Sequence, residues 1–301
     1  MPYRRIAWDR TSFKVPERWE LSSFRWPRPG RMVIELEDDF SICMHGEWQW
    51  SADPRTMRSF LHHLEKRDAD LARRADRKEM VDSALGRWTA VIYHFNKTVP
   101  ESDGKKIRVE RNHIYHAAYS AEGFAASFQI QITKDCPLSV KEVGRTFMES
   151  FRLHREGMVP WELFDISISM PSAFALKDAR FSIGSKHLTF ERRKRQLNLW
   201  ILSCADVILK DAESVEKWCC GFLNSQGGIR GLVFKPTTTG GIVGRRRFPM
   251  VITHLRDIAA WCFRWKVRAI HQKEANRILI WVYHYRWEGD LDWLPDWLSA
   301  P

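Results

Sequence analysis

Residues 15–21 read Val-Pro-Glu-Arg-Trp-Glu-Leu, and residues 170–176 repeat their pattern as Met-Pro-Ser-Ala-Phe-Ala-Leu. Each stretch has an apolar residue, a proline, an aromatic residue three positions after the proline, and a leucine two positions further. Another aromatic residue and a glycine follow, Trp26 and Gly30 in the first copy, Phe181 and Gly184 in the second. The same order of features in two places indicates two diverged copies of one unit.

Both places continue with alternating apolar residues on either side of a charged turn. In the first copy the turn is Glu37-Asp38-Asp39, and in the second it is residues 191–195, Glu-Arg-Arg-Lys-Arg. Alternation with a period of two residues, interrupted by charges, predicts a β-hairpin with one buried face. A helix is expected after each hairpin, from Asp53-Pro54 and from near Ser214, because an amphipathic stretch begins at both places.

The remaining sequence predicts further strands and one more helix, at residues 138–153. Residues 277–285 are apolar on both faces, which predicts a central strand. The predicted fold is α+β, with two similar halves, each an antiparallel sheet with helices packed on one face. The halves are residues 1–157 and 158–289, followed by a Trp-rich tail at residues 290–301. The other predicted strands are residues 88–95, 107–113, 124–132, 164–168 and 263–270.

The composition is that of a globular protein with excess positive charge. Of 301 residues, 44% are hydrophobic and 28% are charged, which excludes a disordered or fibrous chain. The net charge is +11, and the part after Gly157 carries more of the excess although it is shorter. Such a surface attracts anionic partners, among which we favour nucleic acid; the alternative is that the charge only keeps the protein soluble.

The sequence predicts a cytoplasmic protein. Residues 1–13 have no apolar segment after their arginines, and no run of 18 apolar residues is long enough to span a bilayer. The six cysteines have no regular spacing, which favours a reducing compartment.

Two cationic stretches of the second half are candidates for anion binding. One is the predicted hairpin tip at residues 192–195, where adjacent cations repel one another and therefore require an exposed turn. The other is the loop at residues 237–247, whose threonines, glycines and arginines could seat a phosphate, although it is not a Walker A loop. The alternative for both is a solvated surface turn. The candidate residues are Lys186, Arg192, Arg193, Lys194, Arg195, Arg245, Arg246 and Arg247.

No catalytic or metal-binding motif is present in the sequence. His113 and His116 would face opposite sides of a strand, so no metal site and no cofactor is predicted. No GxSxG nucleophile motif occurs. An enzyme whose residues are scattered along the chain remains an open alternative.

The C-terminal tail alternates acidic residues with two Trp-Leu pairs, at Trp293 and Trp297. Indole side chains of this kind anchor a segment in an apolar groove, either of a partner or of the chain's own domain. The favoured hypothesis is a non-enzymatic protein that holds an anionic partner, nucleic acid above all, on its basic second half. The alternative is an assembly subunit, of a homo-oligomer or with another protein, that docks through this tail and its sheet edges.

Overall fold

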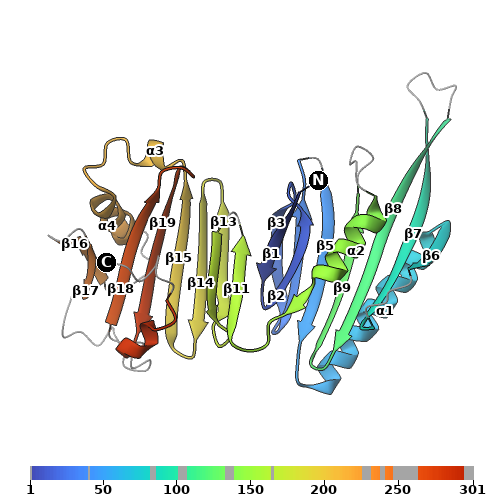
Figure 1. Cartoon of the computed structure of the whole chain (residues 1–301), viewed down its shortest axis with the longest axis horizontal. Helices are drawn as coiled ribbons and strands as arrows, with labels where there is room; N and C mark the ends of the chain where they lie inside the picture. Colours follow the sequence, from blue (N-terminus) through green and yellow to red (C-terminus); the bar gives the residue numbers. More distant parts are fainter. Residues whose placement is uncertain are drawn as a thin grey trace. The chain divides into compact units, whose positions relative to one another are not determined.

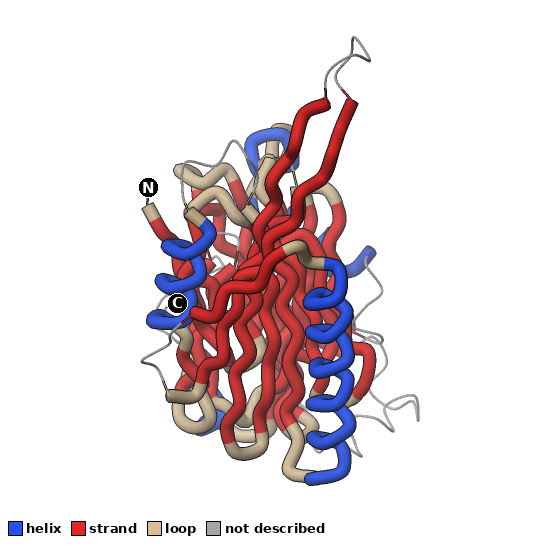
Figure 2. Tube along the Cα trace, turned by 90° about the vertical axis from the view of Figure 1, so that its right-hand side faces the viewer, coloured by secondary structure: helices blue, strands red, loops and turns tan. Residues whose placement is uncertain are grey.

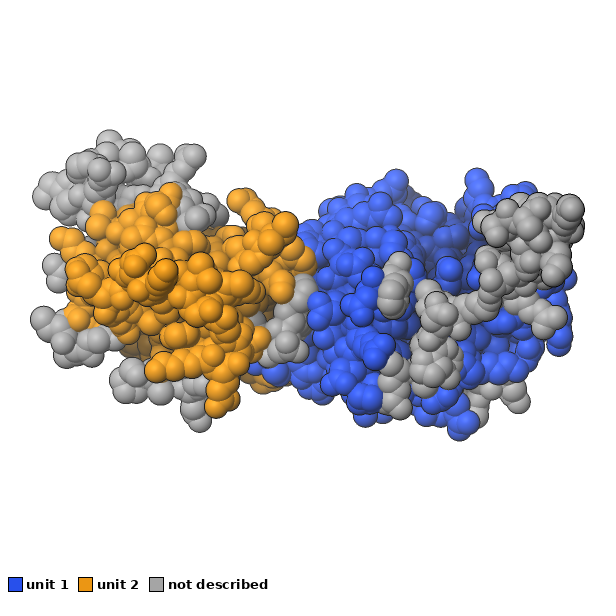
Figure 3. Space-filling view, turned by 90° about the horizontal axis from the view of Figure 1, so that it is seen from above, with its two compact units in different colours: residues 1–155, 160–167 blue, residues 156–159, 168–301 orange. Residues whose placement is uncertain are grey.

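The computed structural model describes residues 2–39, 41–81, 86–100, 107–132, 139–163, 166–225, 232–237, 241–246 and 264–294. These residues form a mostly-β α+β fold with three antiparallel sheets and four α-helices (Figure 1). The chain divides into two compact units (Figure 3). Unit 1 comprises Met1–Arg155 and Pro160–Ser167, and unit 2 comprises Glu156–Val159 and Ile168–Pro301. The α+β prediction is confirmed, but there are three sheets where two were expected.

The unpredicted sheet has five short strands in the order β10-β2-β1-β11-β12. Its β1–β2 hairpin turns through Asp9 and Arg10, which have φ values of 46° and 65°. Two consecutive residues with positive φ form the type I′ turn that suits the twist of a two-residue hairpin. The strands are β1 (Tyr3–Trp8), β2 (Thr11–Pro16), β10 (Arg152–Leu153), β11 (Met158–Leu163) and β12 (Ile166–Pro171).

Unit 1 contains a seven-stranded sheet in the order β3-β4-β5-β9-β8-β7-β6. The predicted hairpin with its turn at residues 37–39 is present, as is the helix after it, and Asp53 caps that helix by accepting hydrogen bonds from the backbone of Arg55 and Thr56. The strands are β3 (Glu20–Arg28), β4 (Arg31–Glu37), β5 (Ile42–Trp50), β6 (Arg77–Val81), β7 (Trp88–Pro100), β8 (Ile107–Ala121) and β9 (Phe124–Gln131). The helices are α1 (Pro54–Arg74) and α2 (Val140–Ser150).

Helices cover both faces of this sheet, which corrects the prediction of one covered face (Figure 2). Helix α1 packs Phe60 against Ala125 of β9. The ring of Phe147 in α2 lies 4.7 Å from that of Phe128, also in β9. Ala125 and Phe128 point to opposite faces because side chains alternate along a strand. Both faces of the sheet are apolar where the helices cross it, so each can bury a helix.

Unit 2 contains a second seven-stranded sheet, in the order β13-β14-β15-β19-β18-β17-β16. Its strand β19 is in the middle and is buried on both faces, as its sequence predicted. Helix α4 packs its buried cysteines and Leu223 on one face. The strands are β13 (Ala175–Ser182), β14 (Ser185–Arg192), β15 (Arg195–Ser203), β16 (Leu232–Pro236), β17 (Ile242–Arg246), β18 (Arg264–Gln272) and β19 (Arg277–Tyr285). The helices are α3 (Ala205–Ile208), α4 (Val215–Ser225) and the short 3-10 helix η2 (Glu288–Leu291).

Across the described ranges, no helix is long and apolar enough to cross a membrane.

The carboxylate of Asp9 is a source of pH-dependent stability. Burial raises its pKa to about 6, although the Trp48 indole N–H, 2.8 Å away, and nearby Arg10 favour the charged form. The unfolded chain has a lower pKa, near 3.8, so the folded protein binds the proton more tightly between these values. The free energy of unfolding therefore falls as pH rises from about 4 through about 6.

We expect Asp9→Asn to raise the free energy of unfolding by about 1–3 kcal/mol at neutral pH and to remove this pH-dependent component. Asparagine keeps an oxygen acceptor for Trp48 and tolerates positive φ. Urea unfolding between about pH 4 and 7.5 measures both effects. Asp211→Asn, at an exposed turn, is the matched control, and an unchanged pH dependence in the Asp9 variant would contradict the assignment.

Candidate anion-binding face of unit 2

Three arginines of unit 2 lie in one row across the end of its sheet. Arg192 of β14 is paired with Arg195 of β15, and Arg264 of β18 is paired with Tyr285 of β19. Continuing the pairing of β15 with β19 by one residue places Arg195 opposite Tyr285. The backbone of Arg245 in β17 falls opposite Arg264 when the β17–β18 pairing is continued by three residues. With strands about 4.8 Å apart, the row of three arginines from β14 to β18 spans roughly 14 Å.

A column of cations continues this row along β18. Arg264, Lys266 and Arg268 alternate with Trp265 and Val267, which pack with the apolar core beneath α4. Alternate side chains share one face, so the three cations face the same side as the row and are about 6.7 Å apart along the strand. Arg264 is exposed, whereas Lys266 and Arg268 are half-buried. We call Arg192, Arg193, Lys194, Arg195, Arg264, Lys266 and Arg268 the basic face.

The predicted hairpin tip is a turn between β14 and β15. Arg193 has a φ of 55° there, and both Arg193 and Lys194 are exposed. Lys186 lies at the other end of β14, six residues from Arg192 and therefore about 20 Å away. The structure brings the four tip cations together, but it does not bring Lys186 to them.

The predicted loop at residues 237–247 is partly a strand. Residues 242–246 form β17, and Thr237 uses its hydroxyl oxygen to accept a hydrogen bond of 2.8 Å from the backbone of Gly241. The backbone of Arg245 and Arg246 reaches the same end of the sheet as the hairpin tip. The side chains of these two arginines, residues 238–240 and the whole of Arg247 lie outside the described residues.

Carboxylates of η2 neutralise part of the basic face. The Arg195 Nε donates to Asp290 at 2.9 Å, and only 16% and 11% of these two side chains is exposed. Asp290 also accepts from the backbone of Arg286 and Trp287, each at 3.0 Å. Burial opposes ionisation of Asp290, but these donors lower its pKa below the ordinary value. Arg195 therefore ties η2 to the sheet, and it is less accessible than the exposed Arg193 and Lys194 beside it.

The tail indole Trp293 packs within unit 2. Its ring centroid is 4.8 Å from that of Phe174 and 5.6 Å from that of Tyr283, and Leu294 beside it is buried. Trp297 lies outside the described residues. Of the two predicted anchors, Trp293 thus contacts its own unit.

A buried polar cluster beneath α1 was not foreseen from the sequence. Ser127 Oγ is 2.8 Å from Nε2 of His116, whose Nδ1 is 2.8 Å from a carboxylate oxygen of Asp68. This is the order of nucleophile, base and carboxylate in a serine hydrolase. The side chains come from β9, β8 and α1, so no sequence motif could reveal them.

The cluster is a structural clamp, because substrate cannot reach it. Ser127 is completely buried, and its oxygen also accepts a hydrogen bond from Arg67 at 2.5 Å. Arg67 in turn donates to Glu47 of β5 at 2.9 Å, and Arg31 of β4 donates to the other oxygen of Glu47 at 2.6 Å. We call Glu47, Arg67, Asp68, His116 and Ser127 the α1 clamp, because it joins α1 to three strands by charged hydrogen bonds.

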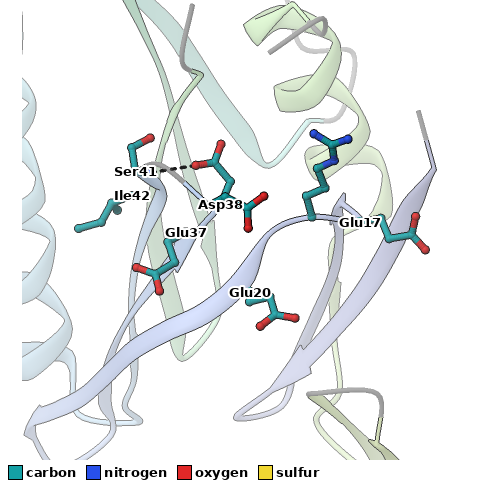
Figure 4. Close-up of a pocket in the computed structure, with 8 residues that line it drawn as sticks. Glu17, Glu20, Glu37, Asp38, Ser41 and Ile42 are labelled. Atoms are coloured by element: carbon teal, nitrogen blue, oxygen red, sulfur yellow. Dashed lines mark hydrogen bonds between the residues drawn. The ribbon is translucent and has the colours of Figure 1, made fainter. Parts of the chain in front are cut away.

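The β4–β5 turn of unit 1 borders an acidic hollow (Figure 4). Its volume is about 870 Å³, and the Asp38 carboxylate accepts a hydrogen bond from the backbone of Ser41 at 2.9 Å. Among the residues that the structure describes, no group of three side chains is placed to hold a metal ion. The hollow would repel a polyanion. Its lining residues are Glu17, Arg18, Glu20, Glu37, Asp38, Asp39, Ser41 and Ile42.

The α1 clamp predicts a large stability loss in Glu47→Gln. Only 4% of the Glu47 side chain is exposed, and two arginines share its charge, so neutralising it leaves buried cations without their counter-charge. We expect the free energy of unfolding to fall by about 3–5 kcal/mol, measured by urea denaturation. Glu65→Gln, on the exposed side of α1, is the control and is expected to cost less than about 0.5 kcal/mol. Equal losses in the two variants would show that the clamp does not hold the helix.

The chain matches no known family model and no curated protein sequence. Among solved structures, it is similar to cyanobacterial PsbP (CyanoP) from Synechocystis sp. PCC 6803, with 17% identity over 50% of this chain and 92% of that one and a TM-score of 0.31. It is also similar to a protein from Bacteroides thetaiotaomicron, with 10% identity over 54% of this chain and 55% of that one and a TM-score of 0.28. Similarity this low assigns neither a family nor a function.

Proposed function

We propose that this protein binds the phosphate backbone of nucleic acid on the basic face of unit 2. The observation that carries the proposal is the cross-strand row in which Arg192, Arg195 and Arg264 share one end of the sheet. Like charges opposite one another on neighbouring strands destabilise a sheet. Arg192 and Arg195 are opposed in this way, and Asp290 offsets their repulsion at Arg195, while Glu288 pairs with Arg264. A bound polyanion would stabilise the row further.

The spread of the cations favours a long anion over a small one. The row spans roughly 14 Å and the column on β18 adds cations about 6.7 Å apart, whereas a single phosphate needs donors that converge on one point. A charged backbone can contact many of these side chains at once. Contacts of this kind position nucleic acid without reading its sequence, and each contacted phosphate adds to the salt dependence of binding.

The competing functions have less support. Assembly through Trp293 would need an exposed ring, and this anchor of the tail is packed against Phe174 and Tyr283. Hydrolysis at Ser127 would need access to an oxygen that is completely buried. We therefore favour a non-enzymatic binding protein.

We also infer that the two seven-stranded sheets arose by duplication of one unit. Numbered within each sheet, the strands follow the same order, 1-2-3-7-6-5-4. In each sheet a helical segment lies between the third and fourth strands. Shared strand order with the same helix position supports a common ancestor more strongly than the short sequence repeat does.

The proposal predicts that removing charge from the hairpin tip weakens binding. Arg193→Asn with Lys194→Gln removes two exposed cations, and asparagine tolerates the positive φ of position 193. For a labelled DNA duplex, we expect affinity at about 50 mM salt to fall roughly five- to tenfold. The slope of log affinity against log salt is expected to fall by about 1.8, because each phosphate contact contributes about 0.9. Fluorescence anisotropy across a salt series measures both.

The matched control is Lys210→Gln with Lys273→Gln. Lys273 lies in the β18–β19 turn, at the opposite end of the same sheet, so this variant loses the same charge away from the basic face. If the control variant loses as much affinity as the tip variant, the loss depends on net charge alone and not on the basic face. Absence of wild-type binding at low salt would overturn the proposal.

A further inference from the structure

The outward side of helix α1 in unit 1 carries a line of basic residues, three arginines, one lysine and one histidine. Arg55, Arg58, His62, Lys66 and Arg73 follow one another at intervals of three, four, four and seven residues. At 3.6 residues per turn, these positions fall within about 60° of one line along the helix. The line is about 27 Å long at 1.5 Å per residue. We call these five residues the α1 ridge.

The α1 ridge is solvent-exposed along its whole length. All five residues are exposed, with 81% of the His62 side chain and 77% of the Arg73 side chain accessible. Two carboxylates flank the line, Glu65 at 3.8 Å from His62 and Asp70 at 2.7 Å from Arg73. Within the described residues, the side chains of Arg55, Arg58 and Lys66 form no ion pair.

The clamp on the inner side of α1 holds this ridge in one orientation. Arg67 and Asp68 point toward the sheet, where they bind Glu47, Ser127 and His116. The helix therefore cannot roll to turn its cations inward. A fixed line of exposed charge attracts a linear polyanion without loss of helix orientation on binding.

The ridge fits a phosphodiester backbone better than a lipid surface. The apolar side chains of α1, including Phe60, Leu64 and Leu71, are buried against the sheet. Helices that bind membrane interfaces insert an apolar face into the lipid, and the exposed side of α1 offers none. Its arginines and lysine lie along one line of the helix, where they can contact phosphates of one backbone.

We infer that the α1 ridge is a second nucleic-acid contact, which binds the phosphate backbone independently of the basic face. This inference rests on the proposed function for the class of ligand, but it concerns other residues in the other unit. Each contact adds its own phosphate contacts to the salt dependence of binding.

The test compares three variants on a labelled DNA duplex of about 40 base pairs. Arg55→Gln, Arg58→Gln and Lys66→Gln together remove three ridge cations with little change in helix propensity. We expect the salt slope to fall by about 2.7 and the affinity at about 50 mM salt to fall at least tenfold. The tip variant of unit 2 reports on the basic face. The control replaces the exposed Lys14, Lys210 and Lys273 with glutamine. Circular dichroism and thermal unfolding check that each variant is folded.

The outcomes separate the two surfaces. Loss of affinity in the ridge variant beyond that of the control supports the inference, whatever the tip variant does. A ridge variant that binds like the control while the tip variant is weakened overturns the inference and leaves the proposed function intact. Equal binding by all variants overturns both. Binding of the wild type to phosphatidylserine vesicles, lost in the ridge variant, with no binding to DNA, would assign the ridge to a membrane and overturn the inference.

Discussion

The pairing of the third strand with the last strand organises each seven-stranded sheet. In unit 2 this pair is β15 with β19, in which Ser203 pairs with Arg277. Strands β16, β17 and β18 lie between these two residues in the sequence. Closing so long a loop costs conformational entropy before any contact forms. Burial along both faces of the pair repays that cost, with Leu199 and Trp281 on one face and Trp200 and Ile280 on the other, all at most 5% exposed. The same pairing brings Arg195 into line with Tyr285 and Arg264, so the basic face depends on it.

The features predicted from the sequence are those that depend on local periodicity. Alternation in residues 277–285 revealed a strand with two buried faces, and Asp53-Pro54 marked the start of α1, because a cap and a central strand leave a signature within a few neighbouring residues. The five-stranded sheet was missed because its strands are short and pair across long separations. Arg152 pairs with Ser12, for example, and no local pattern encodes such a partner.

In the candidate sites, too, the sequence revealed features that depend on neighbouring residues and missed those that depend on pairing between distant segments. A run of four cations placed the hairpin tip correctly at a turn, since repulsion between neighbours is a local effect. The column of Arg264, Lys266 and Arg268 was missed, although its alternation with Trp265 and Val267 is visible in the sequence. A cationic alternation resembles the solvated side of any strand, and only its alignment with Arg192 and Arg195 distinguishes it. The α1 clamp lay beyond sequence reasoning altogether, because its partners come from separate elements.

The carboxylates of η2 differ in how readily a ligand could displace them. Asp290 is held by Arg195 and by two backbone N–H groups, and it is largely buried, so its charge is a fixed part of the fold. The side chain of Glu288 is 69% exposed and contacts Arg264 at the surface, where an ion pair contributes little to stability. A phosphate could replace Glu288 at small cost, whereas replacing Asp290 would detach η2 from the sheet. Competition with a nucleic acid is therefore expected at Arg264 and not at Arg195.

The sign of the charge at the hairpin tips bears on whether the basic face is functional. In the proposed duplication, the β4–β5 tip of unit 1 and the β14–β15 tip of unit 2 occupy the same place in the fold. One carries Asp38 and Asp39, and the other carries Arg193 and Lys194. Because both tips form in sheets of the same strand order, the fold requires a polar turn there but no particular sign. The positive charge at the unit 2 tip is therefore not a requirement of folding, and under the proposed function it would attract a polyanion.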